Sequence, residues 1–446
     1  MSFYNSLLKY FILPVGDTFA SGNYLKHIKE WKTFDLKSET ELNAIQETKL
    51  KDVLEHAIAN IPFYAHQKSN DLKDFPILTK AILREHTQAL VSKSYEISKL
   101  DIHHSSGSTG QQSFTYMTKD HTFYLRALQT HWWHWSGYNF GDPLLQFGIS
   151  QKRSVLKSLK DFFFRTTYVK AFGLSETELK VILQKVKKKK KLYVAGYPSV
   201  INQLAKVSLS TQIKPNVKGI ICFGDKLFDH YKTTITKAFG NNIALVDTYG
   251  CAEGLLMACK NETEYYSIMS PHVCIEIVDD EGRPVDDGDI GNVLVTCLSN
   301  YAMPLIRYKL GDLAVKLPKE DYPKSISLHY PLLKKVIGRE TDVVKTTIGI
   351  TLNIHSFTGV LEYYQAIEQY KIIQNDLESI QIEYIVDKTH PFDVNVLQDI
   401  QLKLQTLTKN CLNITFKQVE KIKPTKSGKP QIIESNLKAT KTVSTS

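Results

Sequence analysis

Apolar residues in the first half of the chain recur at helical spacing in two places. Between residues 41 and 60 they fall mostly three or four positions apart, which predicts an amphipathic helix that ends before Pro62. A second stripe, over 179–186, follows Ser175 and Glu178, whose spacing is typical of a capping box. Five lysines at 187–191 come next. Cations suit the negative C-terminal end of a helix, so we interpret these lysines as a solvated helix end.

The middle of the chain alternates between strand-like and helix-like patterns. Apolar runs and helical patterns follow one another at 192–195, 199–207, 219–223, 229–239 and 243–246. This order predicts parallel α/β units. From residue 273 period-two strands, at 273–278 and 291–298, flank a turn-rich stretch, so this part is predicted to be antiparallel.

The pattern changes again after Gly338. Two strands, a helix and a further strand are predicted beyond it, at 367–374, 380–386, 394–409 and 414–419. We therefore predict an α/β protein with a large N-terminal domain, residues 1–338, that combines parallel α/β sheets with an antiparallel piece. Residues 339–446 are predicted to form a small α+β domain with a loose tail.

Composition and charge narrow the classes of partner. Hydrophobic residues make up 42% and charged residues 23%, as in a globular protein. The formal net charge is +10, and much of it lies in the lysine run and in the stretch 417–441. Such a balance favours nucleic acid, a membrane surface or an anionic small molecule. Because no arginine-rich arm or aromatic–basic interleaving is present, we expect nucleotide or CoA phosphates rather than nucleic acid.

The cysteines and the apolar runs indicate in which cellular compartment the protein is expected. The six cysteines form no CxxC pair and no zinc-type cluster, which indicates a reducing compartment and leads us to expect a cytoplasmic protein. No run of 18 apolar residues occurs, so no transmembrane segment is expected. The first 17 residues lack the pattern of a signal peptide. We interpret them as a core-packed helix, with a peripheral membrane contact as the alternative.

Five short motifs carry candidate chemistry. Ser105–Gly110 (SSGSTG) combines hydroxyls and glycines that let backbone N–H groups approach phosphate oxygens, although the string alone also fits a flexible linker. Asp247–Glu253 follows a predicted strand, where ligands bind in open α/β sheets, and offers the Tyr249 ring for a base and the Glu253 carboxylate for Mg²⁺. Alone it also fits a turn with an incidental acid.

The remaining three motifs lie further along the chain. In Pro304–Asp312, Asp312 follows a glycine turn and suits the two hydroxyls of a ribose, or is an ordinary turn residue. Arg339 lies at the predicted domain boundary, which is a natural place for a cation that faces a cleft. Lys429 follows a Ser-Gly turn in the small domain, where it also fits a surface lysine.

The order of these motifs carries more than any one of them. SSGSTG, YGCAE, IRYKLGD, GRETD and TKSGK resemble the adenylate-forming superfamily of acyl-CoA synthetases. With Asn60–Tyr64 (NIPFY), Phe75–Lys80 (FPILTK) and Gly196–Ser199 (GYPS), the chain is similar to the phenylacetate–CoA ligase group and its capsular-polysaccharide, CapK-like relatives. The resemblance covers about residues 45–435.

The resemblance implies a large domain that holds ATP and a carboxylic acid, and a small mobile domain that closes over it. It implies a phosphate grip, an adenine site, an Mg²⁺ ligand in Glu253, ribose contacts from Asp312 and Arg339, and a catalytic trio of Lys429, Glu253 and Arg339. Lys429 would bridge the acid and the α-phosphate. The phosphate grip would be Ser105, Ser106, Gly107, Ser108, Thr109 and Gly110. The adenine site would be Gly224, Asp225, Lys226, Asp247, Tyr249 and Gly250, with Tyr249 stacking on the base.

The implied activity is formation of an acyl-AMP with pyrophosphate release, then acyl transfer, with ATP, Mg²⁺ and CoA as the small molecules. The chain departs from the pattern at Gln111-Gln112, at Ala252 and at Thr341. The alternatives are a ligase that passes the acyl group to an amine or hydroxyl in cell-surface polysaccharide or secondary metabolism, and a non-catalytic nucleotide-binding module. The sequence leaves the acid and the oligomeric state open. The aromatic segment 131–140 fits either an acyl-pocket wall or a core helix.

Overall fold

The computed structural model describes residues 3–20, 22–104, 113–148, 154–171, 173–339, 343–361, 363–364, 366–387, 391–422 and 432–437. By its internal contacts the chain divides into two compact units. The first comprises residues 1–289, 293–310 and 316–335, and the second comprises 290–292, 311–315 and 336–446. Within the described ranges, no helix combines the length and apolarity needed to cross a membrane.

The central feature is an eleven-stranded mixed sheet. Its strands run in the order β10-β11-β12-β13-β9-β8-β7-β6-β5-β3-β4. Their bounds are β3 (Leu144–Gly148), β4 (Thr166–Lys170), β5 (Leu192–Gly196), β6 (Val217–Cys222), β7 (Ala244–Cys251), β8 (Leu255–Lys260), β9 (Tyr266–Ile268), β10 (Val273–Val278), β11 (Ile290–Cys297), β12 (Tyr308–Lys316) and β13 (Leu332–Arg339).

The sheet changes direction at β7. The pairs β3–β4, β3–β5, β5–β6 and β6–β7 are parallel, whereas β7–β8, β8–β9 and β9–β13 are antiparallel. The predicted parallel α/β units are therefore confirmed, whereas antiparallel pairing already begins at β7, before residue 273 where it was predicted to begin. The hairpin also extends β7 beyond the predicted end at residue 246, because pairing with β8 keeps Asp247–Cys251 extended. The motif predicted to follow this strand is thus part of it.

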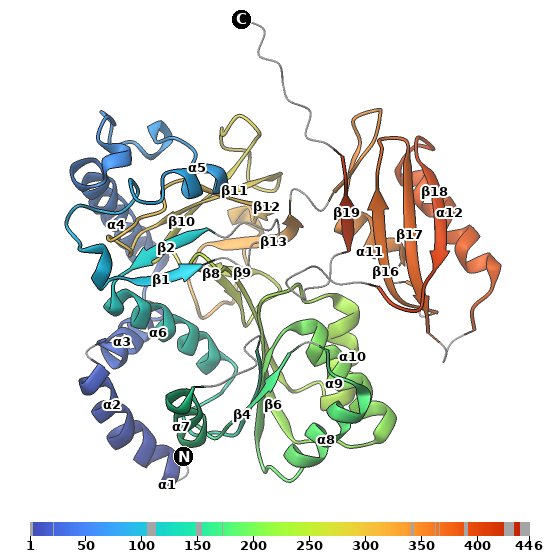
Figure 1. The fold of residues 1–446 in the computed structure, drawn as a ribbon, viewed down its shortest axis with the longest axis horizontal. Helices are drawn as coiled ribbons and strands as arrows, with labels where there is room; N and C mark the ends of the chain where they lie inside the picture. Colours follow the sequence, from blue (N-terminus) through green and yellow to red (C-terminus); the bar gives the residue numbers. More distant parts are fainter. Residues whose placement is uncertain are drawn as a thin grey trace, which may run out of the picture. The chain divides into compact units, whose positions relative to one another are not determined.

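Helices cover both faces of the parallel half, as Figure 1 shows. Leu192 and Val194 of β5 belong to the apolar cluster of α8 (Glu176–Val186), α9 (Pro198–Thr211) and α10 (Asp229–Phe239). Tyr193 and Ala195 point the other way, into the cluster of α3 (Tyr24–Phe34) and α6 (Lys119–Trp135). This alternation is what a strand buried on both faces requires.

Local signals were reliable guides to several elements. The predicted capping box at Ser175 and Glu178 opens α8, which ends at Val186 where the lysine run begins. The helix predicted over 41–60 is α4 (Glu39–Asn60). The aromatic segment near 131–135 is the end of α6, where Trp132 is buried and donates to Met269 Sδ. The core-helix interpretation of that segment is the one observed.

The remaining elements of the first unit flank the sheet. They are α1 (Phe3–Leu7), η1 (Leu8–Ile12), α2 (Leu13–Ala20), η2 (Pro62–Tyr64), η3 (Leu72–Asp74), α5 (Lys80–Glu85), η4 (Ile97–Lys99), the hairpin β1 (Asp101–His104) and β2 (Phe114–Met117), α7 (Val155–Phe163) and η5 (Lys319–Asp321). The six cysteines are all free thiols.

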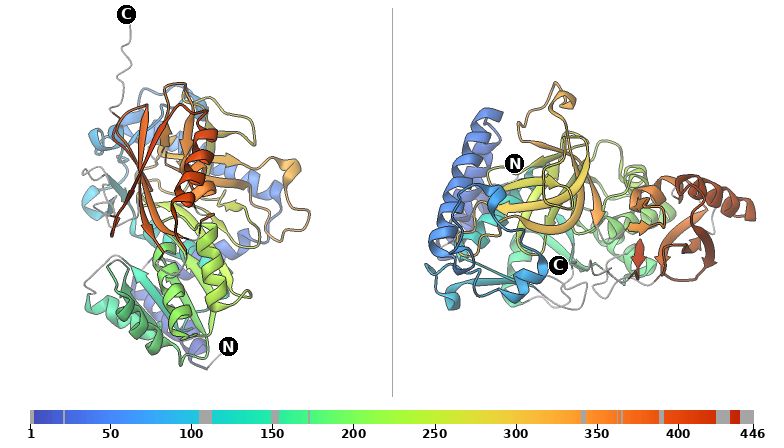
Figure 2. Two further views of the ribbon diagram at one scale, coloured as in Figure 1. Left: turned by 90° about the vertical axis from the view of Figure 1, so that its right-hand side faces the viewer. Right: turned by 90° about the horizontal axis from the view of Figure 1, so that it is seen from above.

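The second unit is an α+β fold, as predicted. Its four-stranded sheet has the order β18-β17-β16-β19, and α12 packs along one face of it (Figure 2). The elements are β14 (Val343–Lys345), β15 (Thr351–Asn353), α11 (Ile354–Leu361), β16 (Ile367–Gln374), β17 (Ser379–Val386), α12 (Val394–Leu407), β18 (Asn413–Gln418) and β19 (Ile433–Ser435). Ile372, Ile382, Ile400 and Leu404 are buried.

Candidate active site

The predicted adenine-site residues come together where β6 ends beside β7. Cys222, the last residue of β6, pairs with Asp247 of β7. The segment Gly224–Lys226, which leaves β6, therefore begins beside the strand that carries Tyr249 and Gly250. This is the carboxyl end of the parallel half of the sheet, where open α/β sheets bind ligands.

Two glycines are required by close approaches in this region. Gly224 has a φ of +87°, and a Cβ there would lie 2.3 Å from the ring of Tyr197. A Cβ at Gly250 would lie 2.7 Å from the carbonyl oxygen of Leu255, across the β7–β8 hairpin. A side chain at either position would displace backbone or an aromatic ring, so both residues fix the local shape of the site.

Polar groups next to these glycines are held by hydrogen bonds. Tyr266 donates to Asp247 Oδ2 at 2.6 Å, and burial raises the pKa of Asp247 to about 6. Ser199 at the start of α9 donates to Asp225 Oδ2 at 2.6 Å. Tyr249 is buried, with its ring centroid 6.2 Å from that of Tyr266.

Glu253 has the most distinctive environment of the predicted site residues. Its side chain is only 5% exposed, yet Oε1 lies 3.3 Å from Lys80 Nζ and accepts a hydrogen bond from Tyr308 at 3.2 Å. Burial alone would raise the pKa of Glu253, but the charge of Lys80 and hydrogen bonds to the carboxylate, from Cys251, the backbone and Lys80, together outweigh it and hold that pKa below its usual value. Glu253 is therefore an ionised carboxylate in a largely dry place.

The segment before Lys80 is held in place by a buried arginine. Arg307, 5% exposed, pairs with Glu276 at 3.2 Å and donates to the carbonyls of Lys73 (3.0 Å), Phe75 (3.3 Å) and Gly282 (2.9 Å). Next to Arg307 in the chain is Tyr308. Leu78 donates to the carbonyl of Arg307 and accepts from the N–H of Lys309, so its backbone pairs with both neighbours of Tyr308. Residues 73–80 are thus fastened alongside 307–309, which brings Lys80 and Tyr308 to the same carboxylate.

The hairpin that flanks the predicted phosphate grip also lies beside Glu253. Thr115 of β2 donates to the backbone carbonyl of Glu253 at 3.0 Å, and a Cβ at Gly254 would touch Met117. The grip itself, Ser105–Gly110, lies outside the described residues, as does Lys429. For Arg339 the backbone is described, at the end of β13, but not the side chain.

Asp312 lies in a different setting from the one predicted. It is a half-buried residue inside strand β12 and not the end of a turn. The preceding Gly311 has a φ of +80°, so the strand is interrupted at the glycine and then continues. Sequence reasoning missed the roles of Lys80 and Tyr308, although both belong to motifs on which the resemblance rests.

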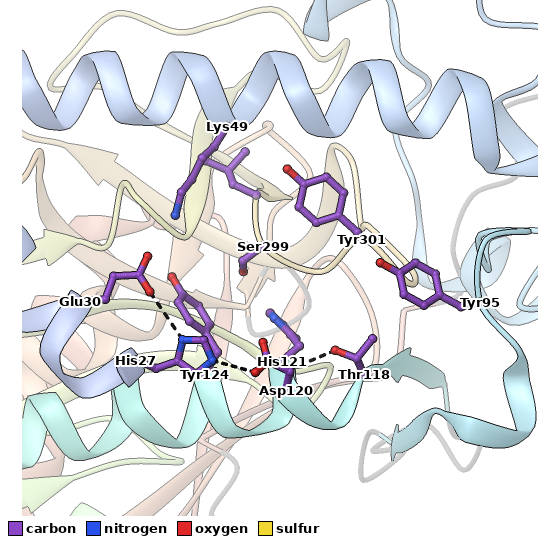
Figure 3. Close-up of a pocket in the computed structure, with 11 residues that line it drawn as sticks. His27, Glu30, Lys49, Tyr95, Thr118, Asp120, His121, Tyr124, Ser299 and Tyr301 are labelled. Atoms are coloured by element: carbon purple, nitrogen blue, oxygen red, sulfur yellow. Dashed lines mark hydrogen bonds and ion pairs between the residues drawn. The ribbon is translucent and has the colours of Figure 1, made fainter. Parts of the chain in front are cut away.

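A separate cavity of about 310 Å³ opens on the first unit between α3, α4 and α6 (Figure 3). His27 joins Glu30 (3.5 Å) to Asp120 (3.2 Å) along its floor, and Lys49 approaches from α4. None of the predicted site residues lines it. The cavity is therefore distinct from the predicted site residues.

Comparison with known proteins gives a consistent result. A family model described as AMP-binding enzyme matches residues 154–299. Protein CapK of Staphylococcus aureus is 24% identical over 95% of each chain, and the phenylacetate–coenzyme A ligase of Escherichia coli (strain K12) is 26% identical over 63% of this chain and 68% of its own. A 2-hydroxyisobutyryl-CoA ligase, solved in the postadenylation state with R3-HIB-AMP, matches with a TM-score of 0.71 at 17% identity, over 90% of this chain and 91% of that one.

The last of these likenesses shows the fold, and the sequence matches agree with it. Together these likenesses support the adenylate-forming superfamily, and within it the group that contains phenylacetate–CoA ligases and CapK. The chain is an AMP-forming acid ligase.

Proposed function

We propose that this enzyme joins a carboxylic acid to AMP with release of pyrophosphate, and then transfers the acyl group to CoA. The observation that carries this proposal is the ionised, buried Glu253, fixed by Lys80 and Tyr308 beside the hairpin that bears the phosphate grip. A carboxylate attacking an α-phosphate meets like charge, so such a reaction needs positioned cations and donors. The E. coli relative, named a phenylacetate–coenzyme A ligase, supports CoA as acceptor.

The ionised carboxylate of Glu253 fits one Mg²⁺ ion that is shared with ATP. In the described part of the chain, no group of three or more His, Cys, Asp or Glu side chains is arranged to hold a metal. Mg²⁺ is usually held by one or two carboxylates together with substrate phosphates and water, which agrees with a single glutamate here. Bound in this way, the ion would neutralise charge on the phosphates.

The other roles follow the same scheme. We assign Ser105–Gly110 to the β,γ-phosphates, Gly224–Lys226 with Asp247, Tyr249 and Gly250 to the adenine, and Asp312 with Arg339 to the ribose. Lys429 is assigned to the acid and the α-phosphate. We place the boundary between a domain that holds ATP and a lid domain at residues 338 and 339. The adenine assignment is supported by the position of these residues, which lie at the carboxyl end of β6 and beside it in β7.

A second acceptor class has its own support. The likeness to CapK extends over 95% of both chains, whereas the likeness to the phenylacetate–CoA ligase covers less of each. This favours an amine or hydroxyl acceptor, as in cell-surface polysaccharide synthesis, as the competing hypothesis to CoA.

The deciding experiment is pyrophosphate release with a panel of carboxylic acids, with and without CoA. We expect release that depends on ATP, Mg²⁺ and acid, with turnover beyond one equivalent only when CoA is added. Turnover that CoA leaves unchanged, but that an amine or a sugar restores, would transfer the proposal to the second acceptor class. ADP and phosphate as products would reject adenylation.

A further inference from the structure

The first helical segments carry an apolar stripe that faces solvent. Segments α1, η1 and α2 follow each other without a break from Phe3 to Ala20. Asn5, Leu8 and Leu13 are buried against the first unit. On the opposite side six large apolar residues are exposed, with Phe3 at 86% and Phe19 at 87%. They are Phe3, Leu7, Tyr10, Phe11, Val15 and Phe19.

The π-helical turn η1 helps to keep these residues on one side. Residues four apart in an α-helix drift around its axis, because a turn holds 3.6 residues. A π turn pairs each residue with one five positions away and so holds more residues. Inserting one between α1 and α2 turns Phe11 and Val15 back toward the side of Phe3 and Leu7.

A second exposed stripe lies next to the first. On the short helix α7, Val155, Leu159 and Phe162 follow at helical spacing and are 85%, 51% and 72% exposed. The two helical segments touch, since Tyr4 donates to the carbonyl of Phe163 at 2.7 Å and the guanidinium of Arg165 lies 4.0 Å from the ring of Tyr4. Figure 1 likewise shows α7 beside α1. We call the nine exposed residues of both stripes the apolar face.

The charges beside the apolar face are mostly positive. Lys9 lies on η1, and Lys157 and Lys160 lie on α7, where both are exposed. Of the acids on these helices, Asp17 accepts hydrogen bonds from the backbone N–H groups of Tyr24 and Leu25, at 2.8 and 3.0 Å. The other acid is Asp161. Aromatic and aliphatic side chains next to lysines are the composition of helices that lie in a membrane interface.

We propose that the apolar face docks this protein on the surface of a membrane that contains anionic lipid. Contiguous exposed apolar surface of this kind marks an interaction site. The side chains of the apolar face point outward from two adjacent helical segments, so each can insert between lipid headgroups. The three lysines would then lie against the negatively charged headgroups. All residues of the apolar face belong to the first unit, and membrane docking through them is independent of which acyl acceptor the enzyme uses.

Vesicle flotation tests the proposal with purified full-length protein and two lipid mixtures, phosphatidylcholine alone and phosphatidylcholine with 30% phosphatidylglycerol. We expect the protein to float with the anionic vesicles and to be released by 0.5 M salt, because lysine–lipid attraction is screened. The triple variant Lys9→Glu, Lys157→Glu, Lys160→Glu should weaken partitioning on the order of 100-fold. Phe11→Glu with Phe19→Glu should weaken it at least about tenfold.

Val181→Glu is the matched control, because Val181 is 58% exposed on α8 of the same unit. It should float like the unaltered protein, and all variants should bind ATP equally by calorimetry, which shows that they are folded. Failure of the unaltered protein to bind anionic vesicles would overturn the proposal. An equal loss of vesicle binding in Val181→Glu would also overturn it. So would sedimentation showing that the unaltered protein is a dimer that binds no vesicles and that Phe11→Glu with Phe19→Glu converts it to a monomer.

Discussion

Lys80 and Glu253, distant in sequence, form an ion pair with Nζ and Oε1 3.3 Å apart. The lysine opens helix α5 and is partly exposed, whereas the glutamate is buried after strand β7. Because Tyr308 donates to the same oxygen, three segments of the first unit meet at one carboxylate. This arrangement fixes an anion at the place where the proposed reaction needs a metal ligand.

We predict that Lys80→Met destabilises the protein and slows adenylation. The substitution leaves Glu253 buried without its counter-charge, a cost of about 1–2 kcal/mol for a pair that is exposed on one side. Urea unfolding at pH 7 measures it. The matched control is Lys51→Met, which breaks an exposed pair with Glu55 and should change the free energy of unfolding by less than about 0.5 kcal/mol. Equal effects of the two substitutions would remove the special role of Lys80.

Glu253→Gln should raise the Mg²⁺ concentration needed for half-maximal pyrophosphate release by at least about tenfold, because it removes a hard anionic ligand. The shape of the side chain and its bond with Tyr308 are retained, so the fold should survive. The measurement is a Mg²⁺ titration at saturating ATP, with the exposed Glu281→Gln as control. Superimposable titrations for all three proteins would argue that Glu253 does not meet the metal.

Asp247→Asn should change how stability depends on pH. In the folded chain the pKa of Asp247 is raised from 3.8 to about 6 by burial, so the folded state binds a proton more tightly than the unfolded state. Ionising Asp247 therefore costs folding free energy as the pH rises from about 4 to 6, on the order of 3 kcal/mol in total. Asparagine has no such cost and can still accept the bond from Tyr266.

The stability of Asp247→Asn relative to the unaltered protein should accordingly grow between pH 4 and pH 7 and then level off. Urea unfolding across this range measures the difference, and Asp286→Asn, at an exposed carboxylate, should run parallel to the unaltered protein. A constant offset for Asp247→Asn at every pH would contradict the burial argument.

Lys429→Ala should separate the two half-reactions. If Lys429 meets the charge that develops on the α-phosphate, its loss should slow acyl-AMP formation about 10²-fold or more while ATP binding persists. Transfer from synthetic acyl-AMP should remain nearly normal, if the proposed lid domain moves Lys429 away from the site in that step. Single-turnover rates of acyl-AMP formation and of acyl transfer measure the two effects separately, with Lys426→Ala as the control. Equal slowing of both steps would indicate a structural lysine.

The sequence by itself determined the elements whose signals are local. The capping box that opens α8, the lysines after its end and the bounds of α10 depend on hydrogen bonds and charges within a few residues, so they were readable from the chain. The order of the motifs likewise predicted the superfamily, because that order resembles the arrangement of motifs in adenylate-forming enzymes.

Only the tertiary structure decided which distant residues share an environment. Asp247 was predicted to follow a strand and instead lies within β7, because pairing with β8, a contact outside the motif, extends the strand. The meeting of Lys80 and Tyr308 at Glu253 depends on Arg307, which precedes β12 and whose side chain bonds to the carbonyls of Lys73 and Phe75. The exposure of Phe3 and Phe19 depends on which side of their helix finds a core. Spacing along a helix tells which residues share a face, but burial is set by what packs against that face, and only the folded chain supplies it.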